Sequence, residues 1–264
     1  MLDSLRHLFR YRALIQGLVA RELTARYRGS LLGVFWSFVN PLLLLLVYTF
    51  VFTVVMPGAR ASHIEHVGVF MFCGILPWTW FQSSLIESSN VLISGGNLIR
   101  KVLFPAEVLP LVTVLSGLVH FCLGLPILAA FLAYYRVAID PLDLLWLPVV
   151  MLVQLLFTAG LALLLAAITV HFRDVRDLLT NVLYLWFFAT PILYPVTQAP
   201  PAVRPWLRLN PITHLATAYQ EILYLDGRFV PGTGFVVMAV LSLAVCAGGY
   251  FVFDRLRDTL AEEV

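Results

Sequence analysis

Six long stretches of this sequence carry no charged side chain. They lie between Arg28 and Arg60, Glu65 and Glu87, Glu107 and Arg136, Asp143 and Arg173, Asp177 and Arg204, and Arg228 and Asp254. Only 12% of the 264 residues are charged and 61% are hydrophobic, whereas a soluble domain carries about 25% charged residues. A soluble fold of this size needs a polar surface that these residues cannot supply. The composition therefore excludes a soluble enzyme, a nucleic-acid-binding domain and a disordered chain.

Each charge-free stretch reaches or approaches the ~18 apolar residues that are needed to cross a bilayer. We therefore predict an all-α integral membrane protein that forms a single domain over residues 1–264 and has six transmembrane helices. The predicted spans are 31–56, 67–93, 109–134, 144–170, 178–194 and 235–253. The fifth is the weakest, because Pro191 and Pro195 interrupt its far end.

The lysines and arginines predict the orientation of these spans. Most of the 17 lie in 1–30, 94–107, 171–177 and 254–264, on one side of the predicted membrane. Cytoplasmic loops carry the excess of lysine and arginine in membrane proteins. Both termini are therefore predicted to be cytoplasmic.

Residues 10–28 predict a basic amphipathic helix before the first span. Leu14, Ile15, Leu18 and Val19 share one face at helical spacing. Such a helix is suited to the cytoplasmic membrane interface. The alternative is a positively charged anchor that only sets the topology.

The segment 191–211 contains six of the 15 prolines, so no straight helix passes through it. The surrounding sequence stays apolar, and broken backbone at membrane depth is tolerated only where protein or a cavity surrounds it. We therefore predict two short re-entrant or interfacial helices within 192–224 on the outer side. The alternative is an ordinary proline-rich outer loop.

Between Gly96 and Pro105 lies a short segment that combines apolar and basic residues. Leu98, Ile99, Val102 and Leu103 form a stripe beside Arg100 and Lys101. Two interpretations are open, because composition alone does not separate them. The segment is either a helix that docks into a groove of a soluble partner or a helix that rests on the lipid surface.

Sequence signatures of catalysis and metal binding are missing. No GxxxxGK[ST] phosphate loop is present, so the chain is not expected to bind nucleotide by itself. His63 and His66 lack a further ligand nearby, so we expect no metal site.

His171, in the tight turn 171–177, is interpreted as a loop histidine at the lipid surface. His120 lies mid-span, where we expect a neutral ring bonded to a neighbouring helix rather than a proton carrier.

The first and fifth predicted spans are rich in aromatic residues. Aromatic faces can pack on the C–H surfaces of a sliding glycan, and packing against lipid or other helices is the alternative. The candidates for a pathway lining are Phe35, Trp36, Tyr48, Tyr184, Trp186, Phe187, Phe188 and Tyr194.

Four motifs together resemble the membrane permease subunit of the ABC exporters that move bacterial surface polysaccharides. They occur in this order: LVARELTARYRGSLLGVFWSFVNPLL at 18–43, GGNLIRKVLFPAEVLPL at 95–111, HFRDVRDLL at 171–179, and the segment 190–215, which begins TPILYPV and ends LNPITHL. The exporters of O-antigen, teichoic acid and capsule belong to that family. The resemblance covers essentially the whole chain.

The resemblance implies a homodimer in the bacterial inner membrane that pairs with two copies of a cytoplasmic ABC ATPase, to which ATP and Mg²⁺ bind. It implies a lipid-linked polysaccharide as cargo, a pore along the dimer axis, and no catalytic residue or cofactor on this chain. It implies coupling to the ATPase through Asn97, Leu98, Ile99, Arg100, Lys101, Val102, Leu103 and Phe104, with His171, Phe172, Arg173 and Asp174 beside them. Arg21, Glu22, Arg26 and Arg28 are candidates for ATPase contacts or for binding the lipid diphosphate.

O-antigen is the expected cargo. The alternatives are a permease of the same fold that exports teichoic acid, capsule, a drug or another lipid, and a polytopic glycosyltransferase. The transferase is disfavoured because no carboxylate cluster marks one membrane face. A small ion-coupled carrier is disfavoured because charge inside the spans is nearly absent.

Overall fold

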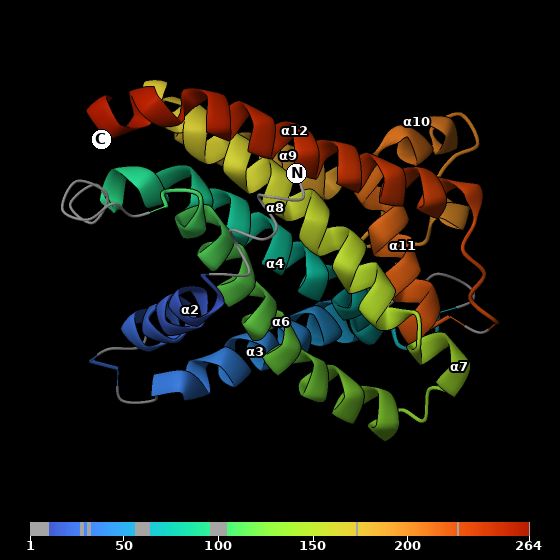
Figure 1. Ribbon diagram of the computed structural model, residues 1–264. Coiled ribbons are helices and arrows are strands. Elements are labelled where there is room, and N and C mark those ends of the chain that lie inside the picture. The colour runs from blue at the N-terminus through green and yellow to red at the C-terminus, as the bar shows by residue number, and fades with distance from the viewer. Residues whose placement is uncertain are drawn as a thin grey trace.

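The computed structural model describes residues 11–26, 29–30, 33–55, 64–95, 105–172, 174–225 and 227–263. Within these residues the chain is helical and contains no strand, so the all-α prediction is confirmed there. Figure 1 shows the arrangement of the long helices. They are α2 (Arg12–Arg26), α3 (Trp36–Phe50), α4 (Val67–Ser94), α6 (Val108–Tyr134), α8 (Leu147–His171), α9 (Asp174–Phe188) and α12 (Thr233–Glu263).

Shorter elements complete the fold. A 3₁₀ turn at Gly33–Phe35 leads into α3, and a π-helical turn at Val51–Val55 continues it. The remaining short elements are α7 (Pro141–Leu144), a 3₁₀ turn at Val196–Gln198, α10 (Arg204–Leu209) and α11 (Pro211–Leu223). Helices α10 and α11 both lie within the predicted segment 192–224.

Among the described residues, five helical segments are long and apolar enough to cross a membrane by length and composition. They are Trp36–Val55, Val67–Ser94, Val108–Tyr134, Pro141–His171 and Thr233–Arg257. The helix at the predicted fifth span differs from its prediction, because α9 begins at Asp174 and ends at Phe188. Its 15 residues extend only ~22 Å at a rise of ~1.5 Å each, which is less than the ~30 Å of a bilayer core.

Helix α4 forms the centre of the fold. In its most apolar window 78% of the residues are buried, compared with 6% for the segment that contains α3. It packs against α3, α6, α8, α9 and α11. Polar bonds join it to its neighbours: the Trp80 indole N–H donates to the Val114 carbonyl of α6 (3.0 Å), and the Gln154 amide of α8 donates to the Pro77 carbonyl (2.8 Å). Such bonds hold helices together where no water competes for them.

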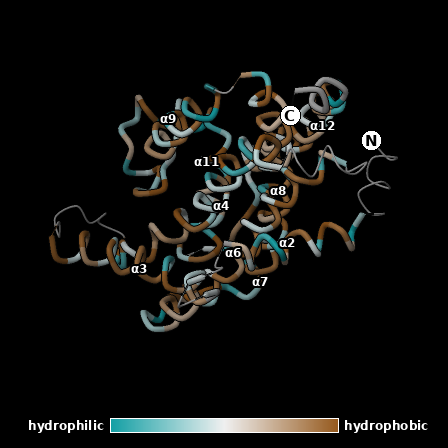
Figure 2. The backbone as a smooth tube through the Cα atoms, turned by 90° about the vertical axis from the view of Figure 1, so that its left-hand side faces the viewer, coloured by the Kyte–Doolittle hydropathy of each residue, from teal (hydrophilic) through white to brown (hydrophobic). Residues whose placement is uncertain are grey.

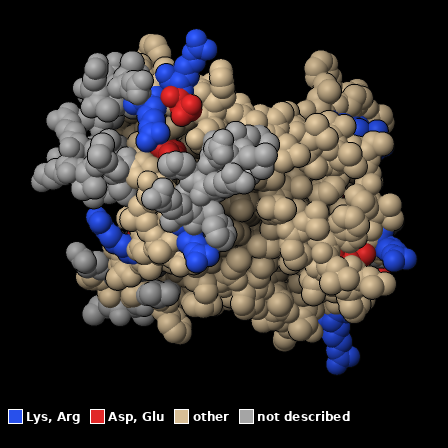
Figure 3. Space-filling view, viewed as in Figure 1, with Lys and Arg blue, Asp and Glu red and all other residues tan. Residues whose placement is uncertain are grey.

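Charge marks two ends of the helical bundle. We call the end where α4 begins and α6 finishes the outer end, and the opposite one the inner end, after the predicted orientation. In the space-filling view of Figure 3, charged side chains gather towards the left and right of the molecule and leave an uncharged band between them. An uncharged band between two charged ends is typical of a protein that crosses a bilayer.

Candidate functional site

The predicted pathway aromatics of the first span point in different directions. Phe35 is 66% exposed, and its ring centroid lies 6.1 Å from that of Phe38. Trp36 is half-buried, and its indole N–H donates to the Ser30 hydroxyl at 3.0 Å. Tyr48 is half-buried and stacks on Phe52 at 6.4 Å. Phe35 is therefore the most exposed of these three predicted residues.

The aromatics of α9 also divide into two groups. Tyr184 is 58% exposed and Phe188 is 65% exposed. Trp186 and Phe187 instead pack on α4: the Trp186 ring stands at 90° to Phe81 at 5.6 Å, and Phe187 lies 5.6 Å from Trp78. Tyr194, beyond the helix, is half-buried. Tyr184 and Phe188 can thus contact another molecule, whereas Trp186 and Phe187 hold α9 to the core.

Helices α3 and α9 both pack against α4. In Figure 2 they lie apart on one side of the molecule, α9 above and α3 below, with α4 and α11 between them. Each of these two helices has an apolar face that is exposed in the single chain. On α3 these are Leu43, Leu46, Val47 and Phe50, and on α9 they are Leu178, Val182 and Leu185.

Asn210 connects α9 to the short outer helices, a role that the sequence did not indicate. Its side-chain oxygen accepts from the Trp186 indole N–H (2.8 Å) and from the backbone N–H of Ile212 (3.1 Å), which caps α11. Its amide N–H₂ donates to the Ala189 carbonyl (3.2 Å) and the Thr190 hydroxyl (2.9 Å). One side chain therefore fixes the break between α9 and α11.

We expect Asn210→Ala to destabilise the protein by about 2 kcal/mol, because the helix cap is lost and the Trp186 N–H is left unpaired. That loss corresponds to a fall of about 4–8 °C in the midpoint of thermal unfolding in detergent. The matched control is Asn181→Ala, since the exposed Asn181 side chain donates to the Asp177 carbonyl one turn earlier in the same helix. Equal midpoints for the two variants would show that Asn210 does not fix this break.

Helix α11 runs alongside the outer half of α4. Its Gln220 amide donates to the carbonyls of Pro191 (3.3 Å) and Ile192 (3.1 Å), and its Tyr219 ring contacts Phe121 of α6 at 5.7 Å. Tyr224, just beyond the helix, accepts from the backbone N–H of His66 at 2.9 Å. The helix thus begins beside the middle of α4 and ends near the first residues of α4.

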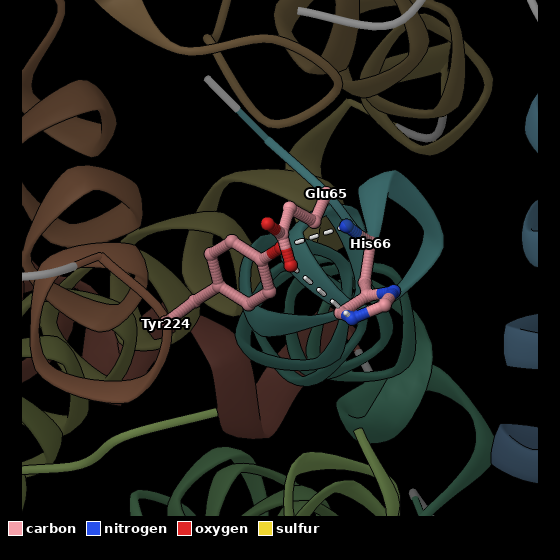
Figure 4. A network of polar contacts seen from close by, with 3 residues as sticks. All are labelled: Glu65, His66 and Tyr224. Carbon is pink, nitrogen blue, oxygen red and sulfur yellow. Dashed lines mark hydrogen bonds and ion pairs between the residues drawn. The ribbon is translucent and has the colours of Figure 1, made fainter. Parts of the chain in front are cut away.

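Figure 4 shows the contact between Tyr224 and the segment that precedes α4. The His66 ring stacks on Tyr135 with centroids 4.1 Å apart, and its Nε2 lies 3.9 Å from a Glu65 carboxylate oxygen. His66 therefore joins the outer ends of α4, α6 and α11. His63 lies outside the described residues, within which no group of three metal-ligating side chains occurs.

A pocket of about 660 Å³ opens between α11, the segment after it and the start of α12. Arg208, His214 and Glu221 line it together with Phe229 and Phe235. The pocket places charge at the outer end, where the sequence predicts an aqueous surface.

The inner end carries the predicted contact residues that the structure describes. His171 ends α8, with its Nδ1 3.1 Å from the Ala167 carbonyl. Phe172 is 67% exposed, and Asp174 begins α9. Arg173 lies outside the description, as do Arg28 and all of the predicted docking helix: Asn97, Leu98, Ile99, Arg100, Lys101, Val102, Leu103 and Phe104.

Helix α2 lies beside α6, with which it makes its main contacts (Figure 1). Ile15, Leu18 and Val19 of the predicted apolar face are half-buried, whereas Leu14 is exposed. Arg21 is exposed and Glu22 is half-buried, while Arg26 closes the helix with a side chain outside the description. The apolar face thus serves at least partly as a contact with the protein itself.

His120 behaves as predicted for a histidine inside a span. Its Nδ1 lies 3.2 Å from the Ser37 hydroxyl, so the ring joins α6 to α3. The sequence did not indicate the partner, because Ser37 lies 83 residues away along the chain.

Comparison with known proteins establishes the family. The ABC-2 type transporter family matches residues 13–224, which is most of the chain. This chain belongs to the ABC-2 type transporter family. It is therefore a multi-pass protein of the bacterial inner membrane and a component of a transporter rather than an enzyme. ABC-2 permeases normally work with an ATPase partner.

Individual relatives within this ABC-2 family are named for polysaccharide export. The O-antigen export system permease protein RfbA of Myxococcus xanthus is 41% identical over 267 residues, covering 100% of both chains. A protein of the same name from Klebsiella pneumoniae is 30% identical over 92% of this chain and 91% of its own. The capsule polysaccharide export inner-membrane protein CtrC of Neisseria meningitidis serogroup B is 22% identical over 77% of this chain and 76% of its own.

Proposed function

We propose that this chain is the membrane-spanning permease subunit of an ATP-driven exporter that moves a lipid-linked O-antigen polysaccharide across the inner membrane. The observation that carries the proposal is the 41% identity, over the full length of both chains, to a permease named for O-antigen export. The capsule-export relative is 22% identical and covers less of the chain. Capsule, teichoic acid, and a drug or other lipid are the alternative cargoes.

The proposed topology has six crossings with both termini in the cytoplasm. Helix α9 supplies the inner part of the fifth crossing and stops at Phe188. The chain then remains beside α4, because α11 packs against that helix. Because α4 is itself long enough to span the bilayer, α10 and α11 are proposed to be re-entrant helices in the outer half of the membrane.

The proposed assembly is a homodimer, with the exposed apolar faces of α3 and α9 turned towards the second copy. The pore then runs between the copies, and the exposed rings of Phe35, Tyr184 and Phe188 contact the glycan. The exposed apolar faces of these two helices support this arrangement, since such faces suit either a partner or lipid. Trp186 and Phe187 do not face the proposed pore, but they hold α9 in place by packing on α4.

The work for transport is proposed to come from two copies of a separate ATPase, which bind ATP and Mg²⁺. ATP binding closes the two ATPases, and the segment 97–104 transmits that movement to the spans. The turn at His171–Asp174 and the Arg21–Arg28 end of the interface helix make further contacts at the same inner end. Arg26 and Arg28 carry the positive charge that would attract a lipid diphosphate there.

Deletion of the gene tests the proposed cargo. We expect surface O-antigen to fall below about a tenth of its normal amount while the lipid-linked polymer accumulates inside the cell, because synthesis continues without export. The measurement is immunoblotting of surface and intracellular glycan, and restoring the gene is the control. Normal surface O-antigen in the deletion strain, or accumulation of a different glycan instead, would contradict the proposed cargo.

A further inference from the structure

A pocket of about 450 Å³ lies between α3, α4 and α6, apart from the exposed aromatics of the proposed pore. Its size falls within the range of about 300–1,000 Å³ that is usual for small-molecule sites. Its polar lining comes from all three helices: Ser37 and Asn40 of α3, Thr79 and Ser83 of α4, and His120 of α6.

The polar lining lies at membrane depth. Each of the three helices belongs to a segment long and apolar enough to span the bilayer, and Thr79 and His120 sit near the middle of α4 and α6. Asn40 and Thr79 are exposed in the chain, and Ser83 and His120 are half-buried. Polar groups facing hydrocarbon without partners are costly. The exposed side chains of Asn40 and Thr79 are therefore suited to face water or a polar ligand.

The chemistry of the lining is neutral throughout. None of the described residues that line the pocket is an acid, a lysine or an arginine. The hydroxyls of Thr79 and Ser83 donate to carbonyls of their own helix, at 2.7 and 3.3 Å. Their oxygens therefore retain the capacity to accept from a ligand. An anionic ligand would lack a cation here, whereas a molecule with several hydroxyl groups finds both donors and acceptors.

Aromatic rings supply the other half of the lining. Trp36, Trp80 and Phe121 line the same pocket as the neutral polar groups. The Trp80 indole N–H is held by the Val114 carbonyl, and its ring lies 5.4 Å from that of Phe121. The rings are thus fixed by protein contacts. A sugar combines hydroxyl groups with C–H surfaces that suit aromatic faces.

We propose that this pocket binds an uncharged sugar residue of the transported glycan, beside the pore and within a single copy of the chain. The proposal rests on the proposed function, since it assumes a glycan cargo. A residue held here lies beside the first half of α3, which is the half nearer the proposed cytoplasmic side. Such a site would retain the polymer between two ATP-driven steps.

Binding by the purified full-length chain in lipid nanodiscs tests the proposal directly. The probes are maltotriose, a neutral trisaccharide, and trigalacturonic acid, an anionic one, and the measurement is isothermal titration calorimetry. We expect maltotriose to bind with a millimolar Kd and trigalacturonic acid to bind at least tenfold more weakly. Absence of maltotriose binding, or tighter binding of the anionic probe, would overturn the proposal.

Variants then locate the site. Asn40→Leu and Thr79→Val should each weaken maltotriose binding at least fivefold. If either variant folds poorly, Ser83→Ala is the milder substitution, because it removes only a hydroxyl group. The matched control is Thr169→Val, because Thr169 is buried in α8 and its hydroxyl bonds only its own helix, as that of Thr79 does. Unchanged affinity in correctly folded pocket variants, judged by their elution and thermal unfolding, would overturn the proposed location.

Export in cells separates this proposal from the proposed function. If deleting the gene abolishes O-antigen export but Asn40→Leu and Thr79→Val export at the normal rate, the pocket proposal fails and the function stands. If deletion leaves O-antigen export intact, the proposed cargo fails. Maltotriose binding that is lost in the pocket variants would then still support a sugar site.

Discussion

Replacing Gly249 with leucine is expected to prevent this chain from accumulating as a folded protein. Helices α8 and α12 form the most extensive helix pair, and they cross at Gly160 and Gly249. A Cβ on Gly249 would overlap the Gly160 carbonyl oxygen and would lie 2.8 Å from its carbon and 3.0 Å from its Cα. These are backbone atoms of a packed helix, so they cannot move aside as a flexible side chain would. We expect the free energy of unfolding to fall by about 3 kcal/mol or more, which is at or above the upper end of the range for overpacked core sites.

The adjacent glycine provides a matched control. A Cβ on Gly248 meets no atom within 4 Å, so Gly248→Leu adds the same volume to the same helix without a clash. Detergent extraction followed by size-exclusion chromatography and thermal unfolding should show a normal protein for Gly248→Leu and an aggregated or absent one for Gly249→Leu. Indistinguishable behaviour of the two variants would mean that α8 and α12 do not cross at these glycines.

Two of the predicted spans agree closely with helices of the structure. The predicted spans 67–93 and 109–134 differ by a residue or less at each end from α4 and α6. Hydropathy works here because lipid leaves the backbone few alternatives to a helix, so length and apolar content largely determine each segment. Charged residues do not set every limit, because α12 continues past Asp254 to Glu263.

The prediction was less accurate where apolar residues continue past the end of a helix. Apolar character persists through Pro191 and Pro195, so hydropathy extended the fifth span to 194, whereas α9 stops at Phe188. The sequence signalled a break there, but the bonds of Asn210 that fix its position join residues more than 20 positions apart. A sequence pattern does not specify such distant partners.

The direction of the aromatic side chains was also not predictable. Every residue of 182–188 in α9 is apolar or aromatic, so the sequence pattern there does not distinguish the face that packs on the protein from the face that does not. Trp186 and Phe187 face α4, whereas their neighbours Tyr184 and Phe188 are exposed. The surface proposed to contact the glycan therefore contains fewer aromatic residues than the sequence predicted.

Changing Leu98, Ile99 and Leu103 together to aspartate is expected to abolish association with the ATPase. If the segment 97–104 docks in a groove, its apolar stripe is buried on binding, and three buried carboxylates would carry a desolvation cost that no docking contact offsets. Co-purification of the ATPase through a tag on the permease should fall below about a tenth of the wild-type amount. Export of the surface glycan should be lost with it.

A second triple variant controls for the added negative charge. Tyr134, Leu142 and Val230 are large, exposed side chains at the outer end, so changing them to aspartate adds the same charge far from the proposed docking site. That variant should retain the ATPase at the wild-type ratio.

The two triple variants also distinguish the two interpretations of segment 97–104. A helix that only rests on lipid would lose membrane contact in the inner-end variant but would leave the ATPase bound. Wild-type retention of the ATPase by the Leu98, Ile99 and Leu103 variant would therefore exclude this segment as the coupling element.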